Sequence, residues 1–303
     1  MIVAIGISVV DHIMLIDGFK KNEGTFHCEN YIIEGGGMAA TALCAASKLG
    51  AETRLFSRIG DDPNGQFIID ALEHFGVDTS GVVKVKGGKS TVSFVLIDIK
   101  TGEKQFYSER VKKAYTDPLE LDVSLLEGAR ALLVDGHWIE AAVKGAQWAN
   151  NNGIPVVADF KRMYDGLEKL FPFIDYFIIP LFFAREITGK QKPEAILKAL
   201  ASIQPGLPVI TMGSEGGIYQ VHDEIRRYRS FPVACVDSTG AGDAFHGAFC
   251  YYLSCGLSLE KCLELASAAG ALNCRSIGGR AGLPSCQELS GFLGLHGSDP
   301  SIP

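Results

Sequence analysis

The chain has 303 residues, of which 47% are hydrophobic and 21% are charged. These proportions are typical of a globular protein that is long enough to bury a sizeable core. A formal net charge of −7 argues against a nucleic-acid binder, which needs a basic face.

Neither a signal peptide nor an apolar run long enough to span a bilayer is evident, so we expect a cytoplasmic protein with no membrane partner. The eight cysteines show no Cys-x-x-Cys spacing, and several lie in apolar patterns. We therefore expect buried thiols in a reducing compartment rather than disulfides or a metal site.

The chain begins with a buried-strand pattern over residues 2–6, and Asp11 follows it. In an open parallel sheet, ligands collect just beyond the carboxyl ends of the strands. Asp11 is therefore either a turn residue or a carboxylate that binds a ligand. Gly35-Gly36-Gly37 then opens a helix that runs to about Leu49, and such glycines permit close approach of a ligand or of another segment.

Residues 53–59 predict a strand, and a helix is expected around residues 67–75. The turn between them contains Asp61 and Asp62, which we interpret as turn and cap residues. Residues 76–79 end this unit.

Two segments, residues 12–34 and 84–110, break the α/β rhythm. They contain β-rich runs at 31–33 and 91–97, and residues 100–104 predict a hairpin turn. We expect these segments to form a small separate sheet.

From Ala129 onward strands and helices alternate, which predicts a parallel sheet with right-handed crossovers. The expected strands are 130–135, 154–159, 175–180 and 207–212, and the expected helices are 139–152, about 164–170, 193–203 and 259–275. Only the tail, residues 297–303, is expected to fray.

A glycine-rich stretch, residues 237–249, lies between a strand-like segment (231–236) and an apolar, helix-compatible one (244–253). The first N–H groups of a helix have no partner inside it, and the helix dipole favours negative charge there. Gly240 and Gly242 would let a phosphate approach this backbone closely. Asp243 then either caps the helix or removes a proton from a hydroxyl that attacks a phosphoryl group.

The residues Asp-Ser-Thr-Gly-Ala-Gly-Asp-Ala-Phe-His-Gly (237–247) resemble the C-terminal signature of the ribokinase-like (PfkB) carbohydrate kinases. The resemblance implies an α/β fold of three layers, α/β/α, with a central mostly parallel sheet and a small β-sheet lid. It divides the chain into an α/β domain (1–11, 35–83 and 111–296) and a lid (12–34 and 84–110) that is often a dimer surface.

The resemblance also implies an ATP-dependent sugar kinase, a phosphotransferase with an alcohol acceptor. In that family the following aspartate is the base and the glycine loop is the anion hole, which assigns catalysis to Asp243 with Gly240, Ala241 and Gly242. The implied sugar contacts are Asp11, Gly36, Gly37, Thr41, His137 and Asp243. Thr41 stands where the family carries an asparagine, and His137 where relatives place a polar residue.

The resemblance implies ATP contacts in the turn after strand 207–212, on the helix at 259–275 and in the glycine loop. These residues are Thr211, Gly213, Ser214, Gly216, Ser267, Gly270, Gly240 and Gly242. A loop for a monovalent cation such as K⁺ would consist of Asp237, Thr239, Asn273, Ser276, Gly278 and Gly282.

Many relatives position Mg²⁺ through an Asn-x-x-Glu motif, but Pro180 and Phe183 occupy those places here. Mg²⁺ would then be held mainly by the ATP phosphates and water. This loss, and residues 278–284, resemble the ketose and sulfofructose kinase branches more than ribokinase itself. Lys161 and Arg162 are either near the phosphates or solvated.

Two other functions remain open. A nucleoside kinase of the same fold would use a stacking aromatic such as Phe26 or Phe94 in the lid. A catalytically weak sugar sensor would account for the missing Asn-x-x-Glu motif. The sugar itself, and the hydroxyl that is phosphorylated, do not follow from the sequence.

Overall fold

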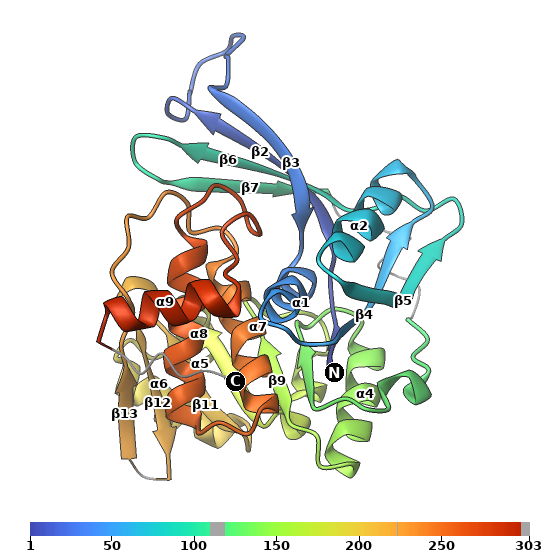
Figure 1. Cartoon of the computed structure of the whole chain (residues 1–303), viewed down its shortest axis with the longest axis vertical. Helices are drawn as coiled ribbons and strands as arrows, with labels where there is room; N and C mark the ends of the chain where they lie inside the picture. The colour runs from blue at the N-terminus through green and yellow to red at the C-terminus, as the bar shows by residue number, and fades with distance from the viewer. Residues whose placement is uncertain (110–118, 223, 298–303) are drawn as a thin grey trace.

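The structure, a computed structural model of the chain, describes residues 1–109, 119–222 and 224–297 (Figure 1). Its centre is a nine-stranded sheet in which neighbouring strands are parallel, except for the two pairs at one edge, which are antiparallel. In sheet order the strands are β13 (Glu224–Tyr228), β12 (Gly217–Val221), β11 (Leu207–Thr211), β10 (Tyr176–Pro180), β9 (Val156–Asp159), β8 (Ala131–Val134), β1 (Ile2–Ile5), β4 (Thr53–Gly60) and β5 (Val77–Val85).

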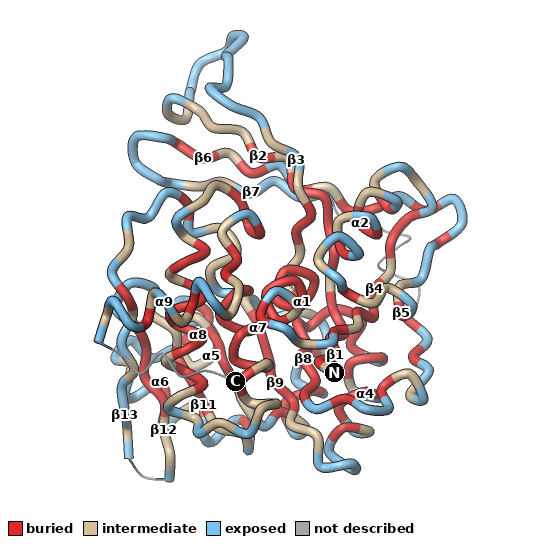
Figure 2. The backbone as a smooth tube through the Cα atoms, viewed as in Figure 1, coloured by how far each residue is buried: buried red, intermediate tan, exposed pale blue. Residues whose placement is uncertain are grey.

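Helices cover both faces of this sheet, because each buried strand sends alternate side chains to opposite sides. Ile2 and Ala4 of β1 pack on one face against α1 (Met38–Lys48), α2 (Pro63–His74), α7 (Ala241–Ser254), α8 (Leu259–Asn273) and α9 (Cys286–Leu295). Val3 and Ile5 pack on the other face against α4 (Ile139–Asn151), α5 (Leu181–Thr188) and α6 (Pro193–Ile203). Figure 2 shows the buried backbone concentrated where these layers meet. The predicted three-layer α/β/α fold is confirmed.

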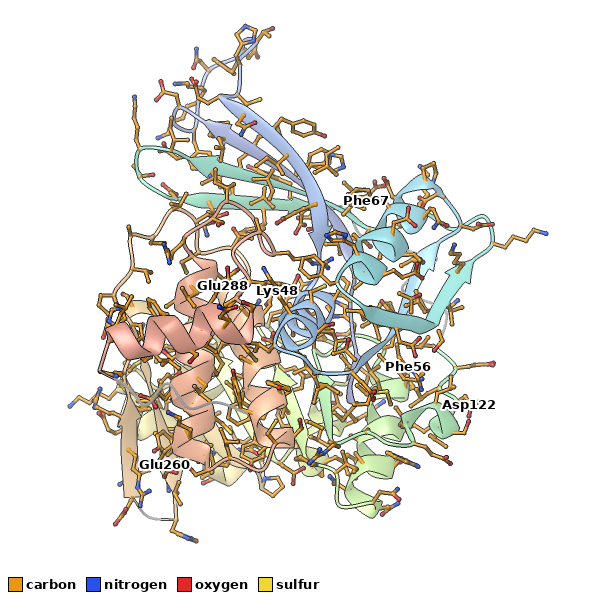
Figure 3. All side chains as sticks on the ribbon, in the orientation of Figure 1. Lys48, Phe56, Phe67, Asp122, Glu260 and Glu288 are labelled. Atoms are coloured by element: carbon orange, nitrogen blue, oxygen red, sulfur yellow. The ribbon has the colours of Figure 1, made fainter. Side chains whose placement is uncertain are left out.

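Side-chain placement follows the same layers (Figure 3). Phe56 of β4 is fully buried in the second core, whereas Asp122 caps a short 3-10 helix at the surface through the N–H of Ser124. Glu288 closes the start of α9 in a capping box with Ser285, which satisfies helix N–H groups that would otherwise be unpaired.

The small sheet stands apart from the large one and has the order β3 (Asn30–Gly36), β2 (Val9–Ile16), β6 (Val92–Asp98) and β7 (Lys104–Ser108) (Figure 1). The central pair, β2 and β6, is parallel, and Asp11 lies opposite Ser93 in the register. The next residue of each strand faces the other side, where an in-register row consists of Ile33, His12, Phe94 and Tyr107.

Several predicted elements differ from the structure. Residues 231–236 form no strand, because Pro232 lacks an N–H and the N–H groups of Val236 and Asp237 donate to the carbonyl of Cys274 at the end of α8. Short 3-10 helices at Leu167–Lys169 and Phe171–Phe173 replace the α-helix predicted near 164–170. The unit predicted to end at residue 79 continues as β5, and β12 and β13 were not predicted.

Other local predictions can be checked directly. Asp62 caps α2, as predicted, by accepting from the N–H of Gly65 at 2.8 Å. Cys44, Cys250 and Cys262 are buried free thiols, as predicted. Cys255, Cys274 and Cys286 are only partly buried, and Cys28 and Cys235 are exposed, so the prediction of buried cysteines is wrong for the last two. The junction predicted at residues 110–111 and the tail 298–303 lie outside the described residues. No helix in the described part of the chain is long and apolar enough to cross a membrane.

Candidate active site

A cavity of about 580 Å³ lies between the small sheet and the carboxyl ends of β1, β8 and β9. The large-sheet side contributes Ile7, Gly37, His137, Lys161, Arg162 and Tyr164, and the start of α7 contributes Gly240, Gly242 and Asp243. The small sheet contributes Asp11, Ser93, Lys104, Phe106 and Ser108. Chain segments more than two hundred residues apart in sequence therefore meet around one space.

A second hollow, of about 460 Å³, lies at the opposite edge of the sheet and includes Gly153, Asp175 and Leu207. These residues are at the amino ends of β9, β10 and β11. Ligands of open parallel sheets bind beyond the carboxyl ends of the strands instead. We therefore place the chemistry in the cavity beneath the small sheet.

Asp135 organises the floor of the cavity at the point where the strand order changes direction, between β8 and β1. Its Oδ2 accepts from the N–H groups of Ile7 at 2.7 Å and Ala39 at 3.3 Å. Its Oδ1 accepts from the N–H of His137 at 3.1 Å and faces the ring Nδ1 of His137 at 2.8 Å. The fully buried carboxylate thus fixes the ends of β1 and β8, the start of α1 and the orientation of the His137 ring.

The glycine loop forms the N-terminus of α7. Gly240 is the N-cap with a φ of 72°, and a Cβ there would lie 2.4 Å from the carbonyl oxygen of Gly279, so only glycine fits this turn. A Cβ at Gly242 would meet nothing within 4 Å. The N–H of Ala241 donates to the carbonyl of Ser238 at 3.3 Å, so one of the three predicted amides already closes the turn.

Asp243 lies in the first turn of α7 and lines the cavity. Its side chain does not cap the helix: Oδ1 pairs with the ammonium of Lys161 at 2.7 Å. Lys161 follows β9, so this ion pair joins the glycine loop to the central sheet. The carboxylate and a cation therefore stand together where a helix N-terminus faces the cavity.

His246, one turn further along α7, supports this loop from behind. Its Nδ1 lies 2.7 Å from the carbonyl oxygen of Gly242, and its Nε2 lies 3.1 Å from that of Ile178 in β10. Carbonyl oxygens only accept, so a ring nitrogen donates wherever it bonds to one of them. Asp159 is fully buried 3.5 Å from Nδ1, and burial raises the pKa of its carboxyl.

Asp11 faces the cavity from the small sheet and is buried. Burial and the nearby Glu34 raise its pKa to about 7, although Arg280 acts in the opposite direction. A Cβ at Gly36 would lie 1.9 Å from Asp11 Oδ2, so Gly36 provides room for this carboxylate rather than lining the cavity.

Thr41 does not lie where the sequence placed it. Its side chain is buried in α1, and its Oγ1 accepts a hydrogen bond from Arg280 Nε at 3.2 Å. Thr41 is also absent from the residues that line the cavity. Arg280 also donates to the carbonyl of Gly36 at 2.9 Å, so Thr41 takes part in a buried hydrogen-bond network instead of lining the cavity.

Comparison with known proteins places the chain. The model described as "pfkB family carbohydrate kinase" matches residues 1–286. The chain belongs to this family. A 5-dehydro-2-deoxygluconokinase of Halalkalibacterium halodurans is 27% identical over 295 residues, covering 89% of this chain and 87% of the relative. A ribokinase of Haemophilus influenzae is 26% identical over 274 residues, covering 87% of this chain and 88% of the relative.

Solved structures agree with the fold. The crystal structure of a candidate ribokinase from Agrobacterium tumefaciens superposes with a TM-score of 0.92 at 26% identity, covering 98% of this chain and 99% of that one. The structure of Arabidopsis thaliana ribokinase complexed with ribose and ATP superposes with a TM-score of 0.83 at 24% identity, covering 96% of this chain and 98% of that one. The pfkB assignment makes this chain a phosphotransferase that uses ATP and acts on a sugar.

Apart from Gly240 and Gly242, the residues predicted to bind the nucleotide do not line the cavity. Thr211 ends β11, and Gly213 and Ser214 form a 3-10 turn before Gly216. On α8, Ser267 Oγ donates to the carbonyl of Arg229 at 2.8 Å, and Gly270 lies against the carbonyl of Ala241. Their contact with a nucleotide stays a prediction.

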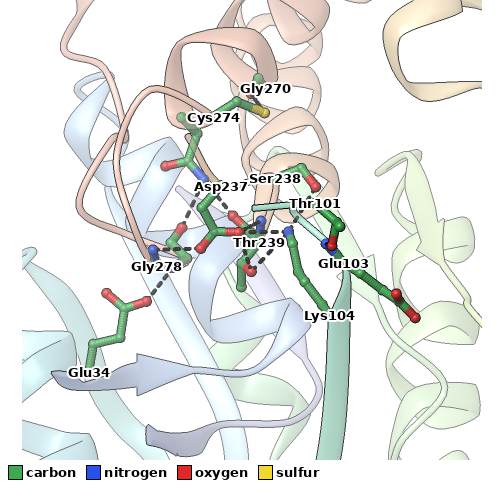
Figure 4. A network of polar contacts seen from close by, with 12 residues as sticks. Glu34, Thr101, Glu103, Lys104, Asp237, Ser238, Thr239, Gly270, Cys274 and Gly278 are labelled. Atoms are coloured by element: carbon green, nitrogen blue, oxygen red, sulfur yellow. Dashed lines mark hydrogen bonds and ion pairs between the residues drawn. The ribbon is translucent and has the colours of Figure 1, made fainter. Parts of the chain in front are cut away.

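The residues predicted for a monovalent cation do converge, and two of the six, Asp237 and Thr239, contact the ammonium of Lys104 (Figure 4). Asp237 accepts from the N–H of Thr239 at 2.9 Å and of Gly278 at 2.9 Å, and it pairs with Lys104 Nζ at 2.6 Å. The side-chain amide of Asn273 donates to the carbonyls of Thr239 and Gly279, each at 3.1 Å. Gly282 lies against the carbonyl of Asn273, and the N–H of Ser276 donates to the same carbonyl.

A protein cage for Mg²⁺ does not fit the described residues, which contain no group of three or more His, Cys, Asp or Glu placed to hold a metal. Pro180 ends β10, Phe183 is buried, and Glu186 is exposed on α5. Magnesium usually keeps several waters and binds through substrate phosphates, which needs no such cage.

Sequence reasoning missed Lys104, Ser93, Phe106 and Tyr164. The period-2 alternation of the small sheet could have placed Ser93 and Asp11 on one face once the register was known. Lys104 was read only as part of a hairpin turn, because nothing local shows that its ammonium reaches a loop more than one hundred residues away.

Proposed function

We propose that this kinase transfers the γ-phosphate of ATP to a hydroxyl of a small sugar, a ketose or a related one, held between Asp11, Gly37 and His137, with Asp243 as general base. One observation carries the proposal: the Asp243 carboxylate lines the same cavity as these polar groups, at the start of a helix whose glycines leave the backbone approachable.

In this proposal the acceptor hydroxyl lies within hydrogen-bond reach of Asp243, which takes its proton as the oxygen attacks the phosphoryl group. The loop at Gly240–Gly242 and the dipole of α7 stabilise the charge on the migrating phosphoryl group. Lys161 holds the carboxylate in place by its ion pair and adds positive charge beside the phosphates. Mg²⁺ would come with the ATP and neutralise its phosphate oxygens.

The two sides together complete the pocket. Asp11 and Ser93 face the sugar from the small sheet, while Phe106 of the small sheet and Tyr164 of the large-sheet side provide apolar walls that keep water away from the γ-phosphate. Arg162 and Lys161 also line the cavity, so a sugar with a carboxylate would meet cations there. The relatives named 5-dehydro-2-deoxygluconokinase act, by that name, on such an acid.

An ADP-release assay over ketoses, aldoses, aldonates and nucleosides tests the proposal and ranks substrates. Nucleosides belong in the panel because Phe106 lines the cavity, although Phe26 and Phe94, the aromatics considered from the sequence, do not.

The variant D243N should bind sugar nearly as well as the parent and lose about 10²–10⁴ in kcat. The matched control is D70N, the same change at an exposed carboxylate of α2. Full turnover by D243N would refute the role of the base. A complete lack of turnover by the parent chain, with sugar binding retained, would instead favour the sensor.

We also propose a cytoplasmic homodimer that pairs through the outer face of the small sheet. The row Ile33, His12, Phe94 and Tyr107 supports this because three of its members are large, exposed and hydrophobic. Light scattering of the parent chain and of F94D is the test, and a monomeric parent would contradict the proposal.

A further inference from the structure

The small sheet reaches the glycine loop through one side chain. Lys104 begins β7, and its ammonium contacts Asp237 Oδ1 at 2.6 Å, Ser238 Oγ at 2.8 Å and Thr239 Oγ1 at 3.2 Å (Figure 4). These three residues come directly before Gly240. A cation carried by the lid is therefore bound in the loop that leads into the anion-binding turn.

Charge accounting leaves little need for a second cation. The Asp237 side chain is fully buried, and that of Lys104 is only 14% exposed. Burial acts to raise the pKa of Asp237, but the hydrogen bonds from Lys104, Gly278 and Thr239 outweigh it and hold the pKa below its usual value. The buried Asp237 charge is thus matched by that of Lys104.

Two further oxygen atoms of this loop also face donors, whereas the buried Oδ1 of Asn273 has no hydrogen-bond partner within the described part of the chain. The Asn273 amide donates to the carbonyls of Thr239 and Gly279, so these oxygens already have partners. A potassium ion needs several such oxygens turned toward it, and it would compete with both the ammonium and the amide. The residues predicted from the family resemblance to hold a monovalent cation do not fit one here while Lys104 is in place.

The opposite edge of the small sheet holds the same region. Glu34 of β3 accepts a hydrogen bond from the N–H of Gly279, whose carbonyl oxygen lies against Gly240. The two edge strands, β3 and β7, therefore contact the loop region from two sides.

We propose that the Lys104 ammonium replaces a bound monovalent cation, so that this kinase works without K⁺ and its anion-binding turn is positioned by the lid. Lys104 is a positioning residue in this proposal, because it acts through Asp237 and Thr239. The proposal rests on the proposed kinase function for its kinetic test but not for its stability test.

The kinetic test compares about 0.1 M KCl, NaCl and tetramethylammonium chloride, so that the ionic strength is constant. The parent kinase should change its kcat by less than about twofold among the three salts. K104M should lose about tenfold or more in kcat in tetramethylammonium chloride, because the buried Asp237 carboxylate loses its partner. KCl should restore part of that loss, since the vacated position then accepts an ion.

The matched control is K100M, which removes the same charge from the same hairpin. Lys100 is exposed and pairs with Asp17 at 2.5 Å, away from the glycine loop. Its kinetics and salt response should equal those of the parent kinase.

Thermal unfolding supplies the readout that needs no turnover. The Tm of the parent should be the same in KCl and tetramethylammonium chloride, whereas the Tm of K104M should rise by about 2–4 °C in KCl, because an ion that binds only the folded state stabilises it. Should K104M not fold, the salt comparison of the parent kinase still decides.

Activation of the parent by K⁺ of about fivefold or more, or its stabilisation by K⁺, would overturn the proposal. So would a K104M variant that keeps full kcat, or one whose only defect is a higher KM for ATP with no response to K⁺, which would make Lys104 a phosphate contact. If no sugar is phosphorylated in any salt, the kinase proposal fails, and the Tm comparison still tests the cation replacement.

Discussion

Asp11 gives the sharpest expected result, because its environment sets opposite demands on stability and on function. The pKa of this carboxyl is raised from 3.8 to about 7, first by burial and then by Glu34. Between these values the folded state binds more protons than the unfolded state, so the free energy of unfolding falls as the pH rises. At 1.36 kcal/mol per pH unit, the raised pKa lowers the free energy of unfolding by about 1.5 kcal/mol at about pH 5 and by about 4 kcal/mol at about pH 8.

The variant D11N keeps the shape of the side chain and removes this titration. Its free energy of unfolding, relative to the parent chain, should therefore increase by about 2.5 kcal/mol from about pH 5 to about pH 8 and level off above about pH 7. Urea unfolding at several pH values measures this directly, with D70N as the surface control. A difference that stays constant within about 0.5 kcal/mol would show that Arg280 outweighs burial and that Asp11 is ionised throughout.

The same titration should appear in catalysis. A carboxylate accepts hydrogen bonds from sugar hydroxyls better than a carboxylic acid does, so the KM for sugar of the parent should fall as the pH rises through about 7. D11N should have a higher KM that does not follow this curve. Parallel pH profiles for both proteins would remove Asp11 from the sugar site.

Three further substitutions separate structure from function. The free energy of unfolding of G242A should lie within about 0.5 kcal/mol of that of the parent, because the added Cβ meets nothing within 4 Å. Its kcat should nevertheless fall about tenfold or more, because the methyl group enters the path of the phosphoryl group. G240A should instead lose about 1–3 kcal/mol of stability from its positive φ and its clash with Gly279, measurable by urea unfolding. T41V should lose about 1–3 kcal/mol, because it leaves the buried Arg280 Nε without its acceptor, while the KM for sugar changes by less than about twofold.

The sequence predicted much of the large sheet because its strands are buried runs with helices between them, and such local patterns persist in the fold. It failed where the partner was distant. Residues 231–236 have a strand-like composition, but the end of α8 supplies their hydrogen-bond acceptor. The edge strand β13 buries no residue fully, so its pattern is weak, and its neighbour β12 is a short run of five residues beginning at a glycine.

The candidate site shows the same division. Asp243 and the glycines could be predicted because the motif that they form consists of consecutive residues. The hydrogen bonds of Asp135 and the contact of Lys104 with the glycine loop could not be predicted, because each joins residues more than ninety positions apart. Thr41 was misplaced because its position in the chain was matched to a family contact, whereas Arg280, arriving from beyond α8, turns its hydroxyl into an internal acceptor.

The small sheet is assembled from two hairpins, β2–β3 and β6–β7, that come from distant parts of the chain and meet only along the parallel pair β2 and β6. Neither hairpin alone is expected to persist in water. We expect this seam to close late in folding, because pairing β2 with β6 brings together segments that are far apart in the chain. Grafting the sheet onto another scaffold as one cassette would therefore fail, and amide exchange should release both hairpins at a common rate.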